Sequence, residues 1–405
     1  MLILRMALRN IARNRRRSLL TGLMIAGGFT LFSATLGISD GTYGSIIEMF
    51  TRSRTGHAQV HAAGYLGHPS LYKTIYDAGR IGKELDGISE VRAWAPRVYS
   101  PALAFVDSKT VGVQVMGVDP VRERAATRLA AQVAEGSFIP DKASSEAVIS
   151  ARLAAALKLK VGDTFSLIAQ GADGSIANDD FRVAGVLSAT DSSFEGPWCF
   201  LHIAKSQEFL ALGRRIHEIA LVFGKYLYAR ENSQAVAAAL SDPGLDVQPW
   251  QVTEKDFYQA MELDKRGGDV SNFIIMVMVA VGVLNTVLMS VLERTREYGV
   301  LKALGTRPGV IFRLIMSEVI LLSLFAAAAG ALISLALNQY LSSTGIPIPT
   351  PVSYGGIRFT RMLSVVNLRI FKEPAITVLF SAVLVGFFPA LKAARTTPVK
   401  AMSSR

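Results

Sequence analysis

Side chains that could carry out chemistry are few in this sequence, and their spacing does not fit a catalytic site. His57 and His61 lie four residues apart in an alternating, strand-like segment, without the H-E-x-x-H pattern of zinc-dependent hydrolases. The phosphate-binding pattern G-x-x-x-x-G-K-[ST] is absent, although Lys83 and Lys225 each follow a glycine. We therefore expect no catalytic residue, no metal site and no ATP hydrolysis by this chain alone.

A more informative set of charges lies in the stretch ERTREYGVLKALGTRPGVIF, residues 293–312, between two long apolar runs. Gly305 is expected to end a short helix here, and Pro308 to begin the next one. A short amphipathic helix joined to two membrane spans would let a soluble partner move both spans together. The pattern leaves a second interpretation open, which is a plain hairpin loop whose charges only set the topology.

Four apolar runs must position these charges, and they cover 18–38, 272–292, 314–337 and 374–390. A helix of about 20 residues crosses a hydrocarbon core of about 30 Å, so the first three runs are long enough and the fourth needs its flanks. The first run is longer than the apolar core of about 7–15 residues in a signal peptide. It also lacks a clear small-x-small cleavage site, and we expect it to be a retained anchor.

Positive charge is concentrated beside these runs. The segments 1–17, 293–313 and 391–405 together carry fifteen Lys and Arg against two Glu, while the whole chain has a net charge of +11. The positive-inside rule places all three in the cytoplasm, which four spans with both termini inside satisfy. The loop 338–373 opposes this topology, because it is also basic and would lie outside. The location of the charge argues against nucleic-acid binding.

The long segment 39–271 has the mixed pattern of a soluble α+β domain. Alternating residues predict strands at 57–61, 111–118, 164–170, 180–187 and 217–223. A strand, a helix and a Gly-Asp turn are expected within 145–163, and a helix with an Asn-Ser start is expected at 231–242. The stretch from about 225 to 271 is expected to be more helical. The single cysteine, Cys199, excludes an intrachain disulfide and is expected to be a buried small hydrophobe.

The sequence thus predicts a membrane protein with four transmembrane α-helices and a large α+β periplasmic domain inserted between helices 1 and 2. The expected order is an amphipathic cytoplasmic-face helix (1–17), the first span (18–38), the periplasmic domain (39–271), the second span (272–292), a cytoplasmic helix (293–312), the third span (313–337), a short periplasmic loop (338–373), the fourth span (374–391) and a cytoplasmic tail (392–405).

Two further features concern the membrane itself. Arg5, Arg9, Arg13 and Arg16 recur on one face of the N-terminal helix, which suits a helix on the membrane surface or a set of topology determinants. Glu318 lies early in the third span, where a carboxylate is costly and is usually paired or functional. It is expected to pair with Arg313 or another group at the cytoplasmic end, or to face a partner subunit, in a structural or coupling role.

Three motifs resemble one family. The stretch 293–322, ERTREYGVLKALGTRPGVIFRLIMSEVILL, resembles the signature of the FtsX/MacB-like permeases, the type VII ABC transporter family. The opening MALRNIARNRRRSLLT (6–21) and the tail FPALKAARTTPVKAM (388–402) resemble the same family. Weaker similarity to the family's periplasmic core domain lies at LAAALKLKVGDTFSLI and FRVAGVL. The resemblance covers nearly the whole chain.

The resemblance implies a non-catalytic transport subunit in a bacterial inner membrane. Such permeases form homo- or heterodimers on two copies of a cytoplasmic ABC ATP-binding subunit and transmit its motion to the periplasmic side. ATP and magnesium would be bound by that partner, and no cofactor by this chain. The coupling residues implied are Glu293, Arg294, Glu297, Gly299, Lys302, Gly305, Thr306 and Arg307.

The layout of the chain is most similar to the lipoprotein-releasing permeases, with TGHAQVHAAGYL (55–66) just after the first span. This similarity implies membrane lipid, lipoproteins and a periplasmic carrier as further partners, and a separate ATPase chain. Two alternatives stay open, namely an efflux or peptide-export permease of a tripartite-type system, and a mechanotransmitter that regulates a periplasmic hydrolase without moving a substrate. The glycines of the first span, Gly22, Gly27, Gly28 and Gly37, suit either a dimer seam or a lipid-accessible groove.

Overall fold

A computed structural model of the chain describes residues 2–189, 194, 196–354 and 357–397. The chain forms two compact units. The helical unit comprises Met1–Tyr43, Met261–Pro347 and Arg361–Arg405, and the globular unit comprises Gly44–Ala260 and Ile348–Thr360.

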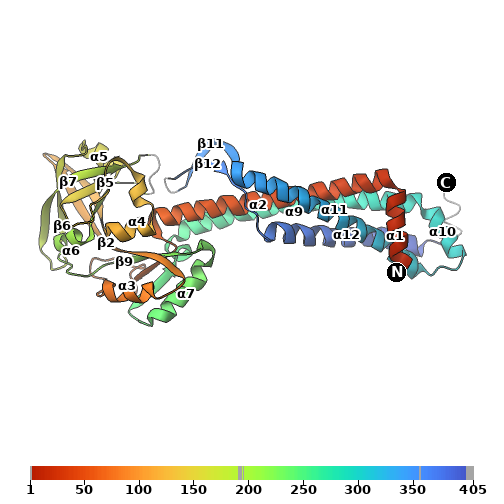
Figure 1. The fold of residues 1–405 in the computed structure, drawn as a ribbon, viewed down its shortest axis with the longest axis horizontal. Coiled ribbons are helices and arrows are strands. Elements are labelled where there is room, and N and C mark those ends of the chain that lie inside the picture. The colour runs from red at the N-terminus through yellow and green to blue at the C-terminus, as the bar shows by residue number, and fades with distance from the viewer. Residues whose placement is uncertain (1, 190–193, 195, 355–356, 398–405) are drawn as a thin grey trace. The chain divides into compact units, whose positions relative to one another are not determined.

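Four long helices build the helical unit and lie side by side in Figure 1. They are α2 (Arg15–Phe50), α9 (Lys255–Glu293), α11 (Pro308–Thr344) and α12 (Arg369–Arg395), and each is long and apolar enough to cross a membrane. Every helix is longer than the apolar run it contains. α12 begins at Arg369 and continues through Pro374 over 27 residues, so its flanks supply the length that the fourth run lacks.

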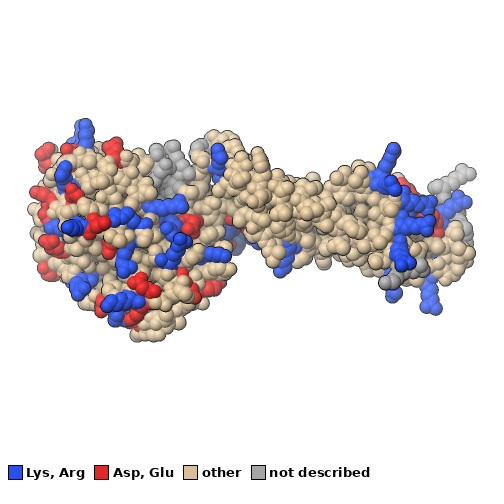
Figure 2. Space-filling view, viewed as in Figure 1, with Lys and Arg blue, Asp and Glu red and all other residues tan. Residues whose placement is uncertain are grey.

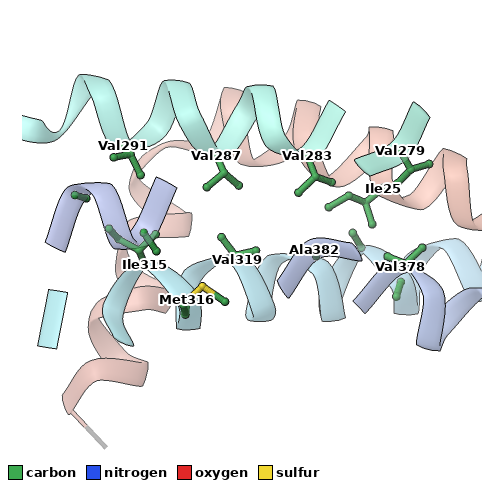
Figure 3. Close-up of a cluster of buried hydrophobic side chains, with 14 of the residues drawn as sticks. Ile25, Val279, Val283, Val287, Val291, Ile315, Met316, Val319, Val378 and Ala382 are labelled. Carbon is green, nitrogen blue, oxygen red and sulfur yellow. The ribbon is translucent and has the colours of Figure 1, made fainter. Parts of the chain in front are cut away.

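A valine face on α9 forms the centre of this bundle. Val279, Val283, Val287 and Val291 recur every four residues, so they lie on one side of the helix and are buried. Figure 3 shows them facing Ile25 of α2, Ile315 and Val319 of α11, and Val378 and Ala382 of α12. The close approach of α2 and α9 requires Gly28, because a Cβ there would lie 2.1 Å from Val279 Cγ2.

A second contact between helices is polar. Asn338 of α11 donates to Ser334 Oγ over 3.0 Å, and its Oδ1 accepts from Ser364 Oγ over 2.7 Å. Ser33 of α2 bonds the same Ser334 hydroxyl, so the network joins α2 to α11. Gly37 makes room for it, since a Cβ would lie 2.2 Å from Asn338 Oδ1. Two of the four span glycines, Gly28 and Gly37, therefore pack inside this unit, whereas a Cβ at Gly22 or Gly27 would meet no atom within 4 Å.

The N-terminal helix is shorter than predicted. α1 covers Leu2–Arg13, and after Asn14 the chain begins α2 at Arg15. Arg5, Arg9 and Arg13 lie on α1, but Arg16 belongs to the first turn of α2. The single helix expected over 1–17 is wrong in this respect. α1 packs against α11, with Ala7 fully buried and Leu4 and Leu8 exposed.

A ten-stranded sheet organises the globular unit, in the order β10-β1-β9-β2-β3-β8-β5-β7-β4, with β6 pairing with β2 and β7. Its strands are β1 (Ala58–Ala62), β2 (Val91–Val106), β3 (Lys109–Val118), β4 (Val133–Gly136), β5 (Glu146–Ile149), β6 (Thr164–Gln170), β7 (Ile176–Leu187), β8 (Trp198–His202), β9 (Glu218–Phe223) and β10 (Leu245–Pro249). The helices are α3 (Ala78–Asp86), α4 (Pro120–Ala126), α5 (Ala151–Leu157), α6 (Ile203–Phe209), α7 (Ala229–Leu240) and α8 (Trp250–Thr253), with the short helices η1 (Thr51–Thr55), η2 (Leu129–Gln132) and η3 (Tyr226–Tyr228).

The pairings divide the sheet into two lobes that share β2. From β2 the strands β3, β8, β5, β7 and β6 return to β2 and close a ring. On its other side, β2 pairs with β9, which pairs with β1 and then β10. β2 has 16 residues and can therefore serve both lobes.

The five strands expected from alternation are present as β1, β3, β6, β7 and β9, and 145–163 folds into β5 and α5 as expected. The helix expected at 231–242 begins earlier, at Ala229, so Asn232 and Ser233 are not its start, and the Ser233 hydroxyl bonds the Ala229 carbonyl. The helical stretch expected after 225 also contains β10, which pairs with β1. Cys199 is fully buried in β8, as predicted, and burial raises the pKa of its thiol.

The loop 338–373 holds structure that the sequence pattern did not indicate. α11 continues to Thr344, and a hairpin of β11 (Ile346–Tyr354) and β12 (Ile357–Met362) follows. Part of the loop's basic charge is neutralised at its end. Arg369 pairs with Asp40 of α2 at 2.9 Å and with Glu373 at 2.7 Å. The positive-inside rule counts Lys and Arg and not net charge, so the basic loop still opposes the expected topology.

Candidate functional site

The charged stretch 293–312 folds as a short helical hairpin between two long helices. α9 ends at Glu293, α10 covers Thr295–Ala303, and α11 begins at Pro308. Gly305 has φ +91°, a backbone conformation that favours glycine, and Pro308 stands at the first turn of α11. The helix end at Gly305 and the helix start at Pro308 are therefore as predicted.

Arg294 lies at the junction of α9 and α10 and is the buried centre of the site. Its side chain is 7% exposed, and Nη1 donates to both carboxylate oxygens of Glu318, over 3.1 and 3.0 Å. Glu318 was expected to pair with Arg313, to pair with another group at the same end of the bundle, or to face a partner subunit. Its partner is Arg294, which is such a group, and not Arg313. This pair joins the start of α10 to the side of α11, so the two helices cannot separate without exposing a buried charge.

Two further ion pairs surround this junction. Arg294 Nε lies 3.5 Å from Glu297, whose side chain is half exposed on α10. Arg17 of α2 pairs with Glu293 at 2.5 Å and donates to the Thr286 carbonyl of α9 over 2.6 Å. The junction therefore connects α2, α9, α10 and α11 through charge-assisted hydrogen bonds.

The inner face of α10 packs into the bundle core. Tyr298 is buried within the valine cluster, and Leu301 packs against the same cluster. Burial raises the pKa of the Tyr298 phenol to about 12, and the nearby Glu318 carboxylate acts in the same direction. Gly299 is also buried. These contacts seat α10 on the bundle as part of its fold.

Lys302 faces inward and caps a neighbouring helix. Its Nζ donates to the carbonyls of Ala393, Ala394 and Thr396, over 3.3, 2.6 and 2.5 Å. Three ammonium donors thus meet carbonyls at the C-terminal end of α12, where the helix dipole is negative. Burial lowers the pKa of this ammonium. The side chain expected to contact an ATPase is therefore engaged within the chain.

The outer face of the hairpin is open and partly apolar. Leu304 is 79% exposed and Val300 is 46% exposed, and Arg307 lies exposed on the same turn. Thr306 is half-buried, and its backbone N–H bonds the Leu301 carbonyl. The predicted apolar strip therefore has two roles, since Leu301 faces the core while Val300 and Leu304 face outward.

Basic side chains gather around this hairpin. Figure 2 shows Lys and Arg crowded at one end of the helical unit, while the length of its helices is almost free of charge. Arg5, Arg9, Arg13 and Arg16 are all exposed. Lys400 and Arg405 of the expected cytoplasmic tail lie outside the described residues.

The described residues contain no group of three His, Cys, Asp or Glu side chains that could hold a metal ion. His57 and His61 are both buried, and His57 instead accepts from the Phe223 backbone N–H over 3.0 Å. Residues 37–41 match the G-x-S-x-G pattern of hydrolase nucleophiles. They lie inside α2, whereas that chemistry needs a strand-to-helix turn.

Sequence reasoning missed Arg17 and Tyr298 as parts of this site. Arg17 stands in a row of three arginines, which showed topology but not which arginine turns inward. Tyr298 is the one aromatic residue in 293–311. A single aromatic side chain in a charged stretch could have indicated a residue that packs inward.

Two family models match successive parts of the chain. Residues 18–243 match the family of the MacB-like periplasmic core domain, and residues 270–398 match that of the FtsX-like permease C-terminal domain. The first match covers more than half of the chain. The second includes the whole hairpin and the Arg294–Glu318 pair.

Two relatives show how far similarity extends. The chain is 23% identical over 346 residues to the lipoprotein-releasing system transmembrane protein LolC of Neisseria meningitidis serogroup B, covering 82% of this chain and 80% of that protein. It is 38% identical over 125 residues to the macrolide export ATP-binding/permease protein MacB 1 of Aeromonas hydrophila, covering 30% of this chain but only 17% of that longer protein.

Among solved structures, the periplasmic region of MacB from Actinobacillus actinomycetemcomitans aligns with 50% of this chain and 94% of its own length, at 12% identity and a TM-score of 0.36. The extracellular domain of the transporter YknZ from Gram-positive bacteria covers 47% of this chain, also at 12% identity, with a TM-score of 0.34. On its family matches, with four helices able to span a membrane and the globular domain between the first two, the chain belongs to the ABC transporter permeases of the MacB/FtsX/LolC type.

Proposed function

We propose that this permease is a force-transmitting subunit that receives the motion of a separate ATP-binding subunit at the α10 hairpin. The proposal rests on the difference between the two faces of α10. Its outer face exposes Val300 and Leu304, while its inner face is locked to the bundle through Arg294 and Tyr298. A partner that pushes on the outer face would therefore move α9 and α11 together.

In this proposal the charged end of the helical unit is cytoplasmic, as are both termini, and the globular domain is periplasmic. The basic side chains around the hairpin support this orientation through the positive-inside rule. The partner would bind ATP and magnesium, two copies of it would serve a dimer of permease subunits, and this chain would carry no catalytic residue. The coupling surface consists of the exposed residues Glu293, Glu297, Val300, Leu304 and Arg307, while Arg294, Gly299 and Lys302 position it.

We propose lipoprotein release from the inner membrane as the transport task. The relative from a lipoprotein-releasing system aligns along 82% of the chain, including the globular domain, whereas the macrolide exporter aligns along 30%. The globular domain is where substrates and carriers would differ, so similarity along it is the relevant support. Export of a small molecule is the second candidate, favoured by the higher identity to the exporter in the shorter match.

Photo-crosslinking tests the docking site. A photoreactive phenylalanine analogue at Leu304 is expected to crosslink to an ATP-binding protein in intact membranes, identified by mass spectrometry. The matched control is Leu332 of α11, which is 71% exposed but lies within the apolar part of the helix. Crosslinks to the ATP-binding protein from Leu332 and not from Leu304 would contradict the proposed surface.

Depletion of the chain in its host tests the transport task separately. Loss of lipoprotein release would leave acylated proteins in the inner membrane, where fractionation and labelling of acyl chains detect them. Normal lipoprotein sorting together with raised sensitivity to macrolides would contradict lipoprotein release and favour export.

A further inference from the structure

A large cavity lies inside the globular unit, away from the hairpin. Its volume is about 550 Å³, within the range of roughly 300–1,000 Å³ typical of small-molecule sites. Its walls come from both lobes of the sheet, with Gln59 and His61 of β1, Tyr99 of β2 and Trp198 of β8 among them.

Glu218 supplies a buried carboxylate on the cavity wall. The residue is 4% exposed, and its Oε1 accepts from Arg97 Nη1 over 2.9 Å and from the Tyr99 hydroxyl over 3.2 Å. Its other oxygen, Oε2, has no hydrogen-bond donor within the part of the chain that the structure describes, and His61 Nε2 lies 3.9 Å away. A donor brought by a ligand would therefore find an acceptor in this oxygen.

The arginine that donates to Glu218 is shared. Arg97 makes two hydrogen bonds to Glu123, over 3.1 and 2.6 Å, and its Nη1 also donates to the Arg54 carbonyl over 2.5 Å. A single guanidinium thus serves two buried carboxylates, which leaves negative charge on the side of Glu218. This imbalance favours a positively charged group in the cavity.

A second carboxylate, Glu254, lines the same cavity. Burial raises the pKa of this carboxyl; Arg54 opposes the rise and Glu218 adds to it. Glu218 and Glu254 therefore repel each other, although Arg54, which lines the same cavity, acts on Glu254 more strongly than Glu218 does. Arg97 and Arg54 thus stand against three carboxylates, Glu123, Glu218 and Glu254, and a bound cation would balance the third.

Aromatic and apolar side chains form the remaining wall. Tyr65, Phe194 and Trp198 line the cavity together with Leu66 and Leu71. Phe194 and Trp198 pack edge to face at 5.3 Å, which holds the Trp198 ring in place. Aromatic rings attract cations and bury apolar ligand groups, so this wall complements the carboxylates.

We propose that this cavity binds a small organic cation whose protonated amine pairs with Glu218 and Glu254 and whose apolar body packs on Tyr65 and Trp198. The site goes beyond the proposed coupling function, because it lies wholly within the globular unit. Its floor includes Arg54 and Thr55 of η1, which directly continues α2, and Thr253 and Glu254, which directly precede α9. η1 is a π-helix, a form that recurs at functional sites. The cavity is therefore lined by residues that follow the C-terminal end of α2 and precede the N-terminal end of α9.

The test uses the full-length chain in lipid nanodiscs and three probes of the same shape: cyclohexylmethylamine, cyclohexylmethanol and cyclohexanecarboxylate. Binding is read from tryptophan fluorescence, with empty nanodiscs to correct for partition into lipid and Trp198→Phe to identify the signal. We expect the amine to bind at least tenfold more tightly than the alcohol and the carboxylate not to bind. Equal affinity for amine and alcohol, or no amine binding, would overturn the proposal.

Two variants assign the site. Glu218→Gln is expected to weaken amine binding at least tenfold and to leave alcohol binding unchanged. Glu218 also accepts a hydrogen bond from Arg97, so its substitution can disturb the fold. Glu254→Gln therefore serves as the second variant, and we expect it to weaken amine binding about threefold or more. Glu231→Gln, an exposed acid on α7, is the matched control and should bind as the unaltered chain does. Amine binding that survives both Glu218→Gln and Glu254→Gln would place the amine elsewhere and overturn the proposal.

Discussion

Two buried arginines, one in each unit of the molecule, meet carboxylates in contrasting ways. Arg97 in the globular unit is 1% exposed, and its donors are taken by two buried carboxylates and a backbone carbonyl. Arg294 in the helical unit has one largely buried partner, Glu318, and a half-exposed one, Glu297. Arg97 is thus fixed from every side, whereas Arg294 has an alternative partner at the surface.

The difference shows what each arginine does for the fold. Arg97 ties β2 to α4 and β9, so that network sets the shape of one wall of the cavity. Burial alone would lower the pKa of Arg97, but Glu123, Tyr99 and Glu218 outweigh it and hold the pKa well above the usual value. Arg294 instead stands between two helices at the point where force would enter. Arg294 can shift between Glu318 and Glu297 without losing its ion pair, which suits a junction that transmits motion.

The largest effect is expected from Arg97→Met. The substitution leaves Glu123 and Glu218 buried without their cation, which typically costs about 3–5 kcal/mol of unfolding free energy. Denaturant unfolding of the purified chain, followed by tryptophan fluorescence, measures the loss. Arg182→Met is the control, because Arg182 is exposed on β7 and should change stability little. A stability of Arg97→Met equal to that of the control would show that the network is not needed.

Arg294→Leu is expected to have the next largest effect, about 2 kcal/mol on stability, because Glu318 is less deeply buried than Glu123 and keeps some contact with solvent. The substitution should also abolish stimulation of the partner ATPase by the permease. The double variant Arg294→Leu/Glu318→Leu should recover stability but not stimulation. Equal losses of stability in the single and double variants would mean that the two residues are not coupled.

Gly37→Ala separates helix packing from coupling. The added Cβ would lie 2.2 Å from Asn338 Oδ1 and force the polar network apart, at a cost of about 1–3 kcal/mol. ATPase stimulation should persist, since the hairpin is untouched. Gly27→Ala is the matched control on the same helix, where no atom lies within 4 Å of the added Cβ. Loss of stimulation in Gly37→Ala would extend the coupling machinery to this network.

The smallest effect is expected from pH, through His217. Its Nδ1 accepts from the Tyr99 backbone N–H over 3.0 Å and its Nε2 donates to the Leu71 carbonyl over 3.1 Å, so the folded chain holds it neutral. Burial lowers its pKa below the ordinary 6.5. The unfolded chain therefore takes up a proton first, and stability present above pH 6.5 should fall as the pH drops below it. His217→Gln should flatten this fall in unfolding curves measured from pH 7.5 to 5.

The sequence predicts the membrane helices and the hairpin well, because apolar length, charge and Gly and Pro positions act locally. It predicts six strands, β5 within the segment 145–163 and β1, β3, β6, β7 and β9 from their clear alternation. The long strand β2 escapes prediction because it serves two lobes and therefore does not alternate evenly between buried and exposed residues. The pairing of Arg294 with Glu318 and the inward turn of Lys302 also escape it, since both depend on which helices become neighbours.

The central claim is that motion enters at the hairpin and reaches the globular domain through α9, with Arg294 as the junction. The most direct measurement is hydrogen exchange at residues 51–55 and 250–254 in the permease reconstituted with its ATP-binding subunit, with and without trapped ATP. We expect trapped ATP to change exchange at both segments in the unaltered chain and to have no effect in Arg294→Leu with the subunit still bound. An ATP-dependent change that persists in Arg294→Leu would contradict the claim.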